Sequence, residues 1–165
     1  MFLDLYGVGN LKIFSNYIIC SGPFIQKTKR NIMQNEQNIL LGEDDLITAK
    51  TIKMFIEKNE SRVIKIVESG EELITAALYE YPSMIITDIS LKGQLDGIEA
   101  MARISEIMDI PYIFITGFSD YISLIKSYSL HPFRIFTKPF DLNLLVKSVK
   151  EAFRTYSEIP SYYVG

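Results

Sequence analysis

Acidic, hydroxyl and amine side chains follow short apolar runs at several places in the sequence. Glu43 and Asp44 come directly after an apolar run that begins at residue 39, and Asp88 follows a second such run. Thr116 ends a third run, and Lys138 follows a fourth. If these runs are parallel strands of one open sheet, their carboxyl ends lie at the edge where a ligand crevice forms. The spacing therefore predicts one crevice that is lined by carboxylates, a hydroxyl and an amine.

The expected crevice has the composition of a metal-assisted phosphoryl-accepting site. Carboxylates within a few ångströms of one another repel, and a divalent cation relieves that repulsion. Oxygen ligands with retained water suit Mg²⁺ best. The carboxylate of Asp88 is a competent nucleophile that can form an acyl phosphate. Lys138 can pair with that carboxylate before transfer and with the phosphate afterwards, and the Thr116 hydroxyl can donate a hydrogen bond to a phosphoryl oxygen.

The elements that must position these residues begin near residue 38. From there, short apolar runs alternate with segments of helical periodicity, which is typical of a parallel sheet with helices on both faces. Asp96-Gly97 and Asp141 are suited to cap two of the helices. The expected strands are 39–42, 62–67, 84–87, 112–116 and 134–137, and the expected helices are 47–58, 71–79, 98–108, 120–130 and 141–156.

Length and composition limit the class of protein. A chain of 165 residues with 48% apolar and 22% charged residues is expected to be a soluble globular domain with a tail. The net charge of −3 gives no basic face for nucleic acid. The single cysteine, Cys20, excludes an internal disulfide and a CxxC metal site. No apolar stretch reaches the roughly 18 residues of a membrane span, and no secretory signal is present, so we expect no membrane association and a cytoplasmic location.

The domain organisation is expected to have three parts. Residues 1–37 lack steady periodicity, and we interpret them as a poorly ordered N-terminal extension or as the product of a mis-assigned start, with Met33 as the alternative first residue. Residues 38–157 form the main domain, and residues 158–165 form a C-terminal tail. With no further domain after the last helix, we expect a stand-alone protein.

Five stretches between residue 38 and about residue 157 together resemble the receiver domains of two-component response regulators. They occur in the order and with the spacing of that family: Ile39-Leu-Leu-Gly-Glu-Asp-Asp, Ile85-Ile-Thr-Asp-Ile-Ser-Leu, Asp96-Gly97-Ile-Glu, Ile113-Phe-Ile-Thr-Gly and Phe136-Thr-Lys-Pro-Phe. The resemblance implies a flavodoxin-like, doubly wound, five-stranded parallel α/β sheet of order 2-1-3-4-5. It also implies a phosphorelay switch that catalyses only its own phosphorylation and dephosphorylation, and is not otherwise an enzyme.

The resemblance also implies roles for the acidic residues. Asp88 would be the phospho-acceptor and a metal ligand, and Asp44 would be the main direct ligand of Mg²⁺. Glu43 would act largely through water, and the backbone carbonyl of Ser90 would complete the protein ligands. Asp45 lies outside this acidic pair.

The switch residues follow the family pattern except at two places. Thr116 would be the switch hydroxyl, and Lys138 the phosphate-pairing amine, with a cis bond before Pro139. The family usually has an aromatic residue three positions before the lysine, and this sequence has Ile135 there. A change of rotamer at Ile135 would give a smaller conformational signal than the movement of an aromatic ring. The loop 91–95 is one residue longer than the commonest form, and its Lys92-Gly93 pair could alter access to the acceptor.

The expected partners are a phosphoryl donor and a downstream protein. A histidine kinase or a phosphotransfer protein would supply the phosphoryl group. An unknown downstream protein would bind the helix 120–130, Ile135 and the C-terminal helix. Three residues of the helix 120–130 are spaced at i, i+4 and i+7 and so share one side of it: Tyr121, Ile125 and Tyr128. This side either binds the downstream protein or packs on the sheet.

Two other functions use similar residues. A magnesium-dependent aspartyl-nucleophile phosphatase usually has a general acid two residues after its nucleophile, and that position is Ser90 here, which disfavours this alternative. A degenerate receiver that only binds partners would normally lack Asp88 or Lys138, and both are present. The sole histidine, His131, precedes a proline and is expected to be structural.

Overall fold

The computed structural model describes residues 11–14, 17–20, 37–117 and 121–157. The chain divides into two compact units, residues 1–35 and residues 36–165. In the first unit, β1 (Leu11–Phe14) pairs antiparallel with β2 (Tyr17–Cys20). The predicted tail, 158–165, and most of the predicted N-terminal extension lie outside the described residues. The site is built by the second unit.

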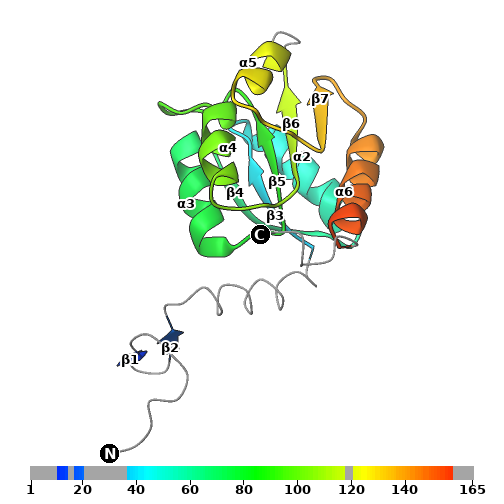
Figure 1. Ribbon diagram of the computed structural model, residues 1–165. Helices are drawn as coiled ribbons and strands as arrows, with labels where there is room; N and C mark the ends of the chain where they lie inside the picture. The colour runs from blue at the N-terminus through cyan, green and yellow to red at the C-terminus, as the bar shows by residue number, and fades with distance from the viewer. Residues whose placement is uncertain (1–10, 15–16, 21–36, 118–120, 158–165) are drawn as a thin grey trace, which may run out of the picture. The chain divides into compact units, whose positions relative to one another are not determined.

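The second unit contains a sheet of five parallel strands in the order β4-β3-β5-β6-β7 (Figure 1). With β3 counted as the first strand of this sheet, this is the predicted order 2-1-3-4-5 of the doubly wound, flavodoxin-like fold. Residues of β3, β5 and β6 are all buried, because helices cover both faces of the sheet at its centre. The strands are β3 (Asn38–Gly42), β4 (Arg62–Val67), β5 (Met84–Asp88), β6 (Tyr112–Thr116) and β7 (Arg134–Thr137).

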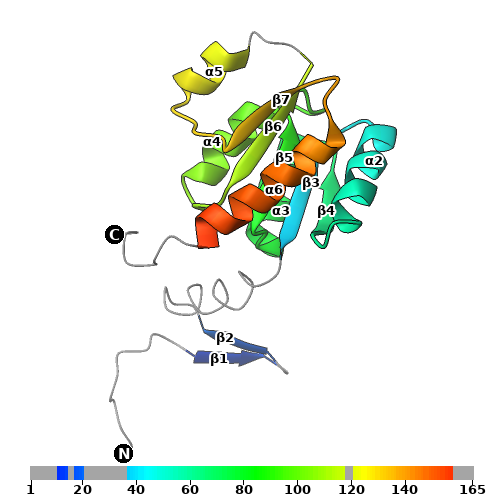
Figure 2. The same ribbon diagram turned by 90° about the vertical axis from the view of Figure 1, so that its right-hand side faces the viewer.

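Helices lie on the two faces of the sheet, with α3 and α4 on one face and α2 and α6 on the other (Figures 1 and 2). Neighbouring strand residues alternate between two core clusters, as side chains of a strand must. Leu40 and Ile85 pack with α3 and α4, whereas Leu41 and Ile86 pack with α2 and α6. The helices are α2 (Leu46–Glu57), α3 (Gly70–Glu80), α4 (Gly97–Ser105), α5 (Tyr121–Ser127) and α6 (Leu142–Ser157).

Two predicted helices end earlier than expected. The helix predicted at 98–108 ends at Ser105, and the helix predicted at 120–130 ends at Ser127. After α4, the amides of residues 107 and 108 both donate to the Ile104 carbonyl, which closes a turn instead of extending the helix. After α5, Ser129 adopts a left-handed conformation with φ of 54°, which stops a right-handed helix. The other described strand and helix ends lie within one residue of the prediction.

Short side chains begin the helices at the carboxyl edge of the sheet. Asp96 caps α4 in a capping box, in which its carboxylate accepts from the Glu99 amide and the Glu99 carboxylate accepts from the Asp96 amide. Asp45 caps α2 by accepting from the Thr48 amide at 2.7 Å. The Asp141 carboxylate accepts from the Asn143 amide at 2.8 Å, as expected of a helix cap. Among the described residues, no helix is long and apolar enough to cross a bilayer.

Candidate functional site

The acidic residues predicted to share a crevice do lie together. Strands β3 and β5 are direct neighbours, with Gly42 opposite Thr87, so the residues that follow each strand meet at one edge. One carboxylate oxygen each from Glu43, Asp44 and Asp88 lies within 4.8 Å of the other two. Glu43 is 1% exposed and Asp88 is 5% exposed, whereas Asp44 is half-buried. These three carboxylates are called the acidic cluster below.

Lys138 reaches into the acidic cluster from the loop after β7. Its Nζ lies 2.6 Å from Asp88 Oδ2, 2.9 Å from Glu43 Oε2 and 3.2 Å from Glu43 Oε1. The backbone of the lysine is held by its amide, which donates to the Thr116 carbonyl at 2.7 Å. The predicted cis peptide bond joins Lys138 to Pro139. One ammonium therefore bridges two buried carboxylates that come from different strands.

Burial and charge act against each other in this cluster. Burial is the main cause that raises the pKa of Glu43; Asp88 adds to this rise and Lys138 opposes it. For Lys138, burial lowers the pKa, but the hydrogen bonds to Asp88 and Glu43 outweigh burial and leave the pKa raised. Three carboxylates face one ammonium, so an all-oxygen donor set with uncompensated negative charge remains. That donor set fits a hard divalent cation such as Mg²⁺.

Ser90 and Thr116 lie on segments that neighbour Asp88 at this edge of the sheet. The Ser90 amide donates to Asp88 Oδ1 at 2.9 Å. Thr116 is 2% exposed and ends β6, one residue beyond the Ile115 that pairs with Asp88. A Cβ built on Gly117, the residue after Thr116, would meet nothing within 4 Å, so the space beside this glycine is open.

A close backbone approach fixes the start of α4 against Asp88 and Ile89. The Gly97 amide donates to the Ile89 carbonyl at 2.8 Å. A Cβ on Gly97 would collide with the Asp88 carbonyl oxygen, so only glycine allows this approach. The two ends of the loop between Asp88 and α4 are therefore held against each other.

Sequence reasoning missed one acidic residue at this edge. Glu68 directly follows β4, and its Oε2 lies 2.8 Å from the Nζ of Lys92 in the loop after β5. The same ammonium lies 3.4 Å from the Asp44 carbonyl oxygen. The signal was present, because Glu68 follows its strand as Glu43 follows the neighbouring one. Lys92 was predicted to alter access to Asp88, but its ion pair with Glu68 was not predicted.

The side of α5 predicted to contact a downstream protein is divided between core and surface. Ile125 is 3% exposed and belongs to a core cluster, so the alternative of packing on the sheet is correct for this residue. Tyr128 is 42% exposed. Ile135 is half-buried and packs against the same cluster as Ile125. The Tyr121 side chain and residue 120 lie outside the described part of the chain.

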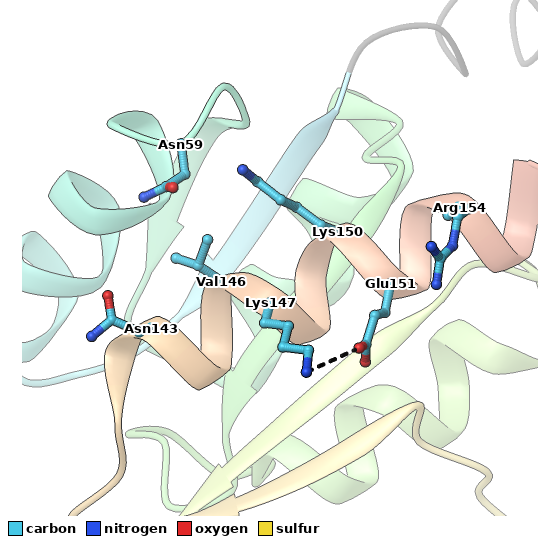
Figure 3. Close-up of a pocket in the computed structure, with 7 residues that line it drawn as sticks. All are labelled: Asn59, Asn143, Val146, Lys147, Lys150, Glu151 and Arg154. Atoms are coloured by element: carbon cyan, nitrogen blue, oxygen red, sulfur yellow. Dashed lines mark ion pairs between the residues drawn. The ribbon is translucent and has the colours of Figure 1, made fainter.

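Two hollows lie on the α2–α6 side of the molecule. One, of about 300 Å³, borders Lys138 and is lined by the first turns of α2, the loop after β7 and the start of α6: Ile47, Thr48, Thr51, Ile52, Lys138, Pro139, Phe140 and Leu142. The other, of about 520 Å³, runs along α6 and includes no member of the acidic cluster (Figure 3): Asn59, Asn143, Val146, Lys147, Lys150, Glu151 and Arg154. In the second hollow, Glu151 is paired with Lys147 (Figure 3). Glu151 is also paired with Arg134, which does not line the hollow.

Comparison with known families and proteins identifies the family to which this fold and acidic cluster belong. Residues 39–150 match the family model described as the response regulator receiver domain. The DNA-binding transcriptional regulator NtrC of Klebsiella pneumoniae is 30% identical over 55% of this chain and 19% of its own length. Response regulator RR06 of Streptococcus pneumoniae is 27% identical over 72% of this chain and 54% of its own length. The chain thus spans between about a fifth and about half of these curated relatives.

Solved structures of receiver and response regulator domains have the same fold as residues of the second unit. The signal receiver domain of a modulated diguanylate cyclase from Desulfovibrio desulfuricans G20 superposes with a TM-score of 0.65 and 30% identity, covering 73% of this chain and 95% of that one. The N-terminal domain of a response regulator/sensory box/GGDEF protein from Carboxydothermus hydrogenoformans superposes with a TM-score of 0.65 and 27% identity, covering 73% and 96%.

Proposed function

The chain belongs to the response regulator receiver domain family, and from this premise we propose that it is a phosphorelay switch whose phospho-acceptor is Asp88. The observation that carries the proposal is the Lys138 ammonium, 2.6 Å from the Asp88 carboxylate inside a buried acidic cluster. The proposed donor is the phosphohistidine of a histidine kinase or of a phosphotransfer protein. We expect this phosphoryl transfer to take place in the cytoplasm, where ATP is available to phosphorylate the kinase.

The proposed transfer forms one bond and breaks another. A carboxylate oxygen of Asp88 attacks the phosphorus, and an O–P bond forms as the N–P bond of the phosphohistidine breaks. The electron pair of the broken bond stays on the imidazole nitrogen. Lys138, which pairs with the carboxylate beforehand, then pairs with the phosphoryl oxygens. Attack of water on the acyl phosphate releases phosphate and restores the carboxylate.

Glu43, Asp44, Asp88 and the carbonyl of Ser90 are the proposed protein ligands of Mg²⁺. Support comes from the three carboxylates, each of which places one oxygen within 4.8 Å of the other two, while among the described side chains only the Lys138 ammonium is hydrogen-bonded to them. When bound, the ion offsets the negative charge of the phosphoryl oxygens. Ser90 also fixes the acceptor, because its amide already donates to Asp88 Oδ1.

Thr116 is the proposed link between the phosphate and the outer surface. The phosphoryl group adds about −1.5 to −2 charges, which the Thr116 hydroxyl can meet with a charge-assisted hydrogen bond. The loop after β6 would move inward, and the half-buried Ile135 would take the place of the usual aromatic residue in sensing that movement. A downstream protein would bind the face formed by α5, Ile135 and α6.

The proposal is tested by incubating the protein with acetyl phosphate and Mg²⁺ and measuring the intact mass. The parent protein is expected to gain one phosphate, and Asp88→Asn is expected to gain none. Asp45→Asn is the matched control, because it makes the same chemical change at an exposed helix cap of the same edge. Phosphate gain by Asp88→Asn would overturn the assignment. Steady phosphate release from an unrelated phosphate ester would favour the phosphatase instead.

A further inference from the structure

We propose that Lys92 is a specificity-determining residue of this site, whose ammonium weakens divalent-cation binding and favours capture of an anionic phosphoryl donor. The inference rests on the proposed function of the acidic cluster. It concerns a residue that lies outside the cluster, in the loop between β5 and α4. Its basis is the fixed position of one positive charge at the rim of the cluster.

Side chain and backbone both hold Lys92 at that rim. Its Nζ lies 2.8 Å from Glu68 Oε2 and 3.4 Å from the Asp44 carbonyl oxygen. Its amide donates to the Glu68 carbonyl at 3.0 Å, and Lys92 forms a parallel bridge with Ser69. The loop after β5 is thereby joined to the loop after β4. The ammonium of the Lys92–Glu68 pair contacts the main-chain carbonyl of Asp44, the residue whose carboxylate belongs to the acidic cluster.

Further contacts keep the rest of the loop in place. Glu71 Oε1 accepts from the Gln94 amide at 2.9 Å and from the Leu95 amide at 3.2 Å. Gly93 has φ of 98°, which glycine adopts without strain, and it lies close to the Glu71 carboxylate. The Lys92 side chain is 57% exposed, but its ammonium is paired with Glu68 and its loop has defined anchors. Its charge therefore acts on the site from a defined position.

A fixed positive charge has opposite effects on the two ligands of the site. It repels an incoming divalent cation, and it attracts the phosphate of a donor such as acetyl phosphate. Replacing Lys92 with a neutral residue should therefore tighten Mg²⁺ binding and slow phosphoryl transfer. A residue that only held the loop in place would behave differently, because a looser loop would misplace Ser90 and weaken both processes. The direction of the two changes separates the two roles.

The experiment compares Lys92→Gln with Lys92→Arg, which keeps the charge, and with the parent protein. Isothermal titration calorimetry measures the Kd for Mg²⁺ without a donor, and intact mass follows phosphate gain from acetyl phosphate at saturating Mg²⁺. For Lys92→Gln we expect Mg²⁺ binding roughly threefold tighter and phosphorylation roughly threefold slower, the size typical of one solvent-exposed charge. Lys92→Arg should resemble the parent.

Lys65→Gln is the matched control for the charge. Lys65 forms a similarly exposed ion pair with Glu80 at 3.3 Å, and neither residue belongs to the acidic cluster. This variant should leave both measurements unchanged. At about 1 M salt, where the Debye length is about 3 Å, the differences caused by Lys92→Gln should shrink.

Two results would overturn the inference: unchanged Mg²⁺ affinity in Lys92→Gln, or a loss of both Mg²⁺ affinity and phosphorylation rate. Urea unfolding of each variant shows whether a loss reflects a damaged fold. If the parent binds Mg²⁺ but gains no phosphate on Asp88, the proposed function fails, and the Mg²⁺ affinities alone decide the role of Lys92. If the parent binds no Mg²⁺, both proposals fail.

Discussion

Glu43 carries an ionisable carboxyl at a position that is 1% exposed. Burial, helped by the neighbouring Asp88 and opposed by Lys138, raises its pKa above the ordinary value of 4.5. A pKa that is higher in the folded than in the unfolded protein favours the folded state while the group is protonated. This contribution to stability is fully present below the unfolded pKa and is lost as the pH rises through the folded pKa. Glu43 thus costs stability near neutral pH.

Replacement of this residue by glutamine removes that dependence on pH. As the pH rises from about 4.5 towards neutral, the free energy of unfolding of Glu43→Gln should increase relative to that of the parent protein. The slope should reach at most about 1.4 kcal/mol per pH unit. Urea unfolding followed by circular dichroism, in EDTA, measures the difference. A difference that stays constant or changes sign with rising pH would contradict the prediction.

The Lys138 ammonium compensates the charge of two buried carboxylates, so its removal should lower the free energy of unfolding as well as impair the proposed phosphoryl transfer. Without metal, Lys138→Met should lower the free energy of unfolding by about 2 kcal/mol, because Glu43 and Asp88 are left buried without their cation. The double variant Lys138→Met/Glu43→Gln should recover part of this loss. Lys65→Met, at an exposed ion pair, should cost less than about 1 kcal/mol. Equal losses in the two lysine variants would refute the account.

At the scale of the elements, the start of α4 holds the end of β5. The Gly97 amide bonds the Ile89 carbonyl, and no space exists for a Cβ beside the Asp88 carbonyl. Gly97→Ala should therefore displace the Asp88 backbone and lower the free energy of unfolding by about 1–3 kcal/mol. If Asp88 is the phospho-acceptor as proposed, the variant should also be phosphorylated more slowly by acetyl phosphate. Gly117→Ala is the matched control, since its Cβ would meet nothing within 4 Å. A normal phosphorylation rate in Gly97→Ala would contradict the proposed positioning.

At the scale of the whole molecule, both core clusters of the described residues are built between Ile39 and Phe153. A chain that begins at Met33 contains all of these residues. It should unfold cooperatively in urea, with a midpoint close to that of the full sequence and with an unchanged Kd for Mg²⁺. The full sequence, measured in parallel, is the control. Loss of the cooperative transition would show that residues 1–32 are needed for folding.

Local pattern was sufficient to predict the strands and the acidic cluster. A buried parallel strand needs an unbroken apolar run, and the polar residue that ends the run then lies at the carboxyl edge of the sheet. The sequence alone places Glu43, Asp44 and Asp88 together in this way, because each follows a buried strand and the two strands are neighbours. The caps Asp96 and Asp141 were likewise visible, since a cap depends on the next three residues.

Only the tertiary structure decided how charges from distant segments pair and where two helices stop. The pairing of Lys138 with Asp88 was predicted from the sequence, but the hydrogen bonds of Lys138 to Glu43, 95 positions away, and the ion pair of Lys92 with Glu68, 24 positions away, were not. The sequence left open whether Ile125 packs on the sheet, and its place in a core cluster decides this. The helix α5 ends before Ser129, which is left-handed. Periodicity describes what one segment prefers, whereas these features depend on which other segment lies against it.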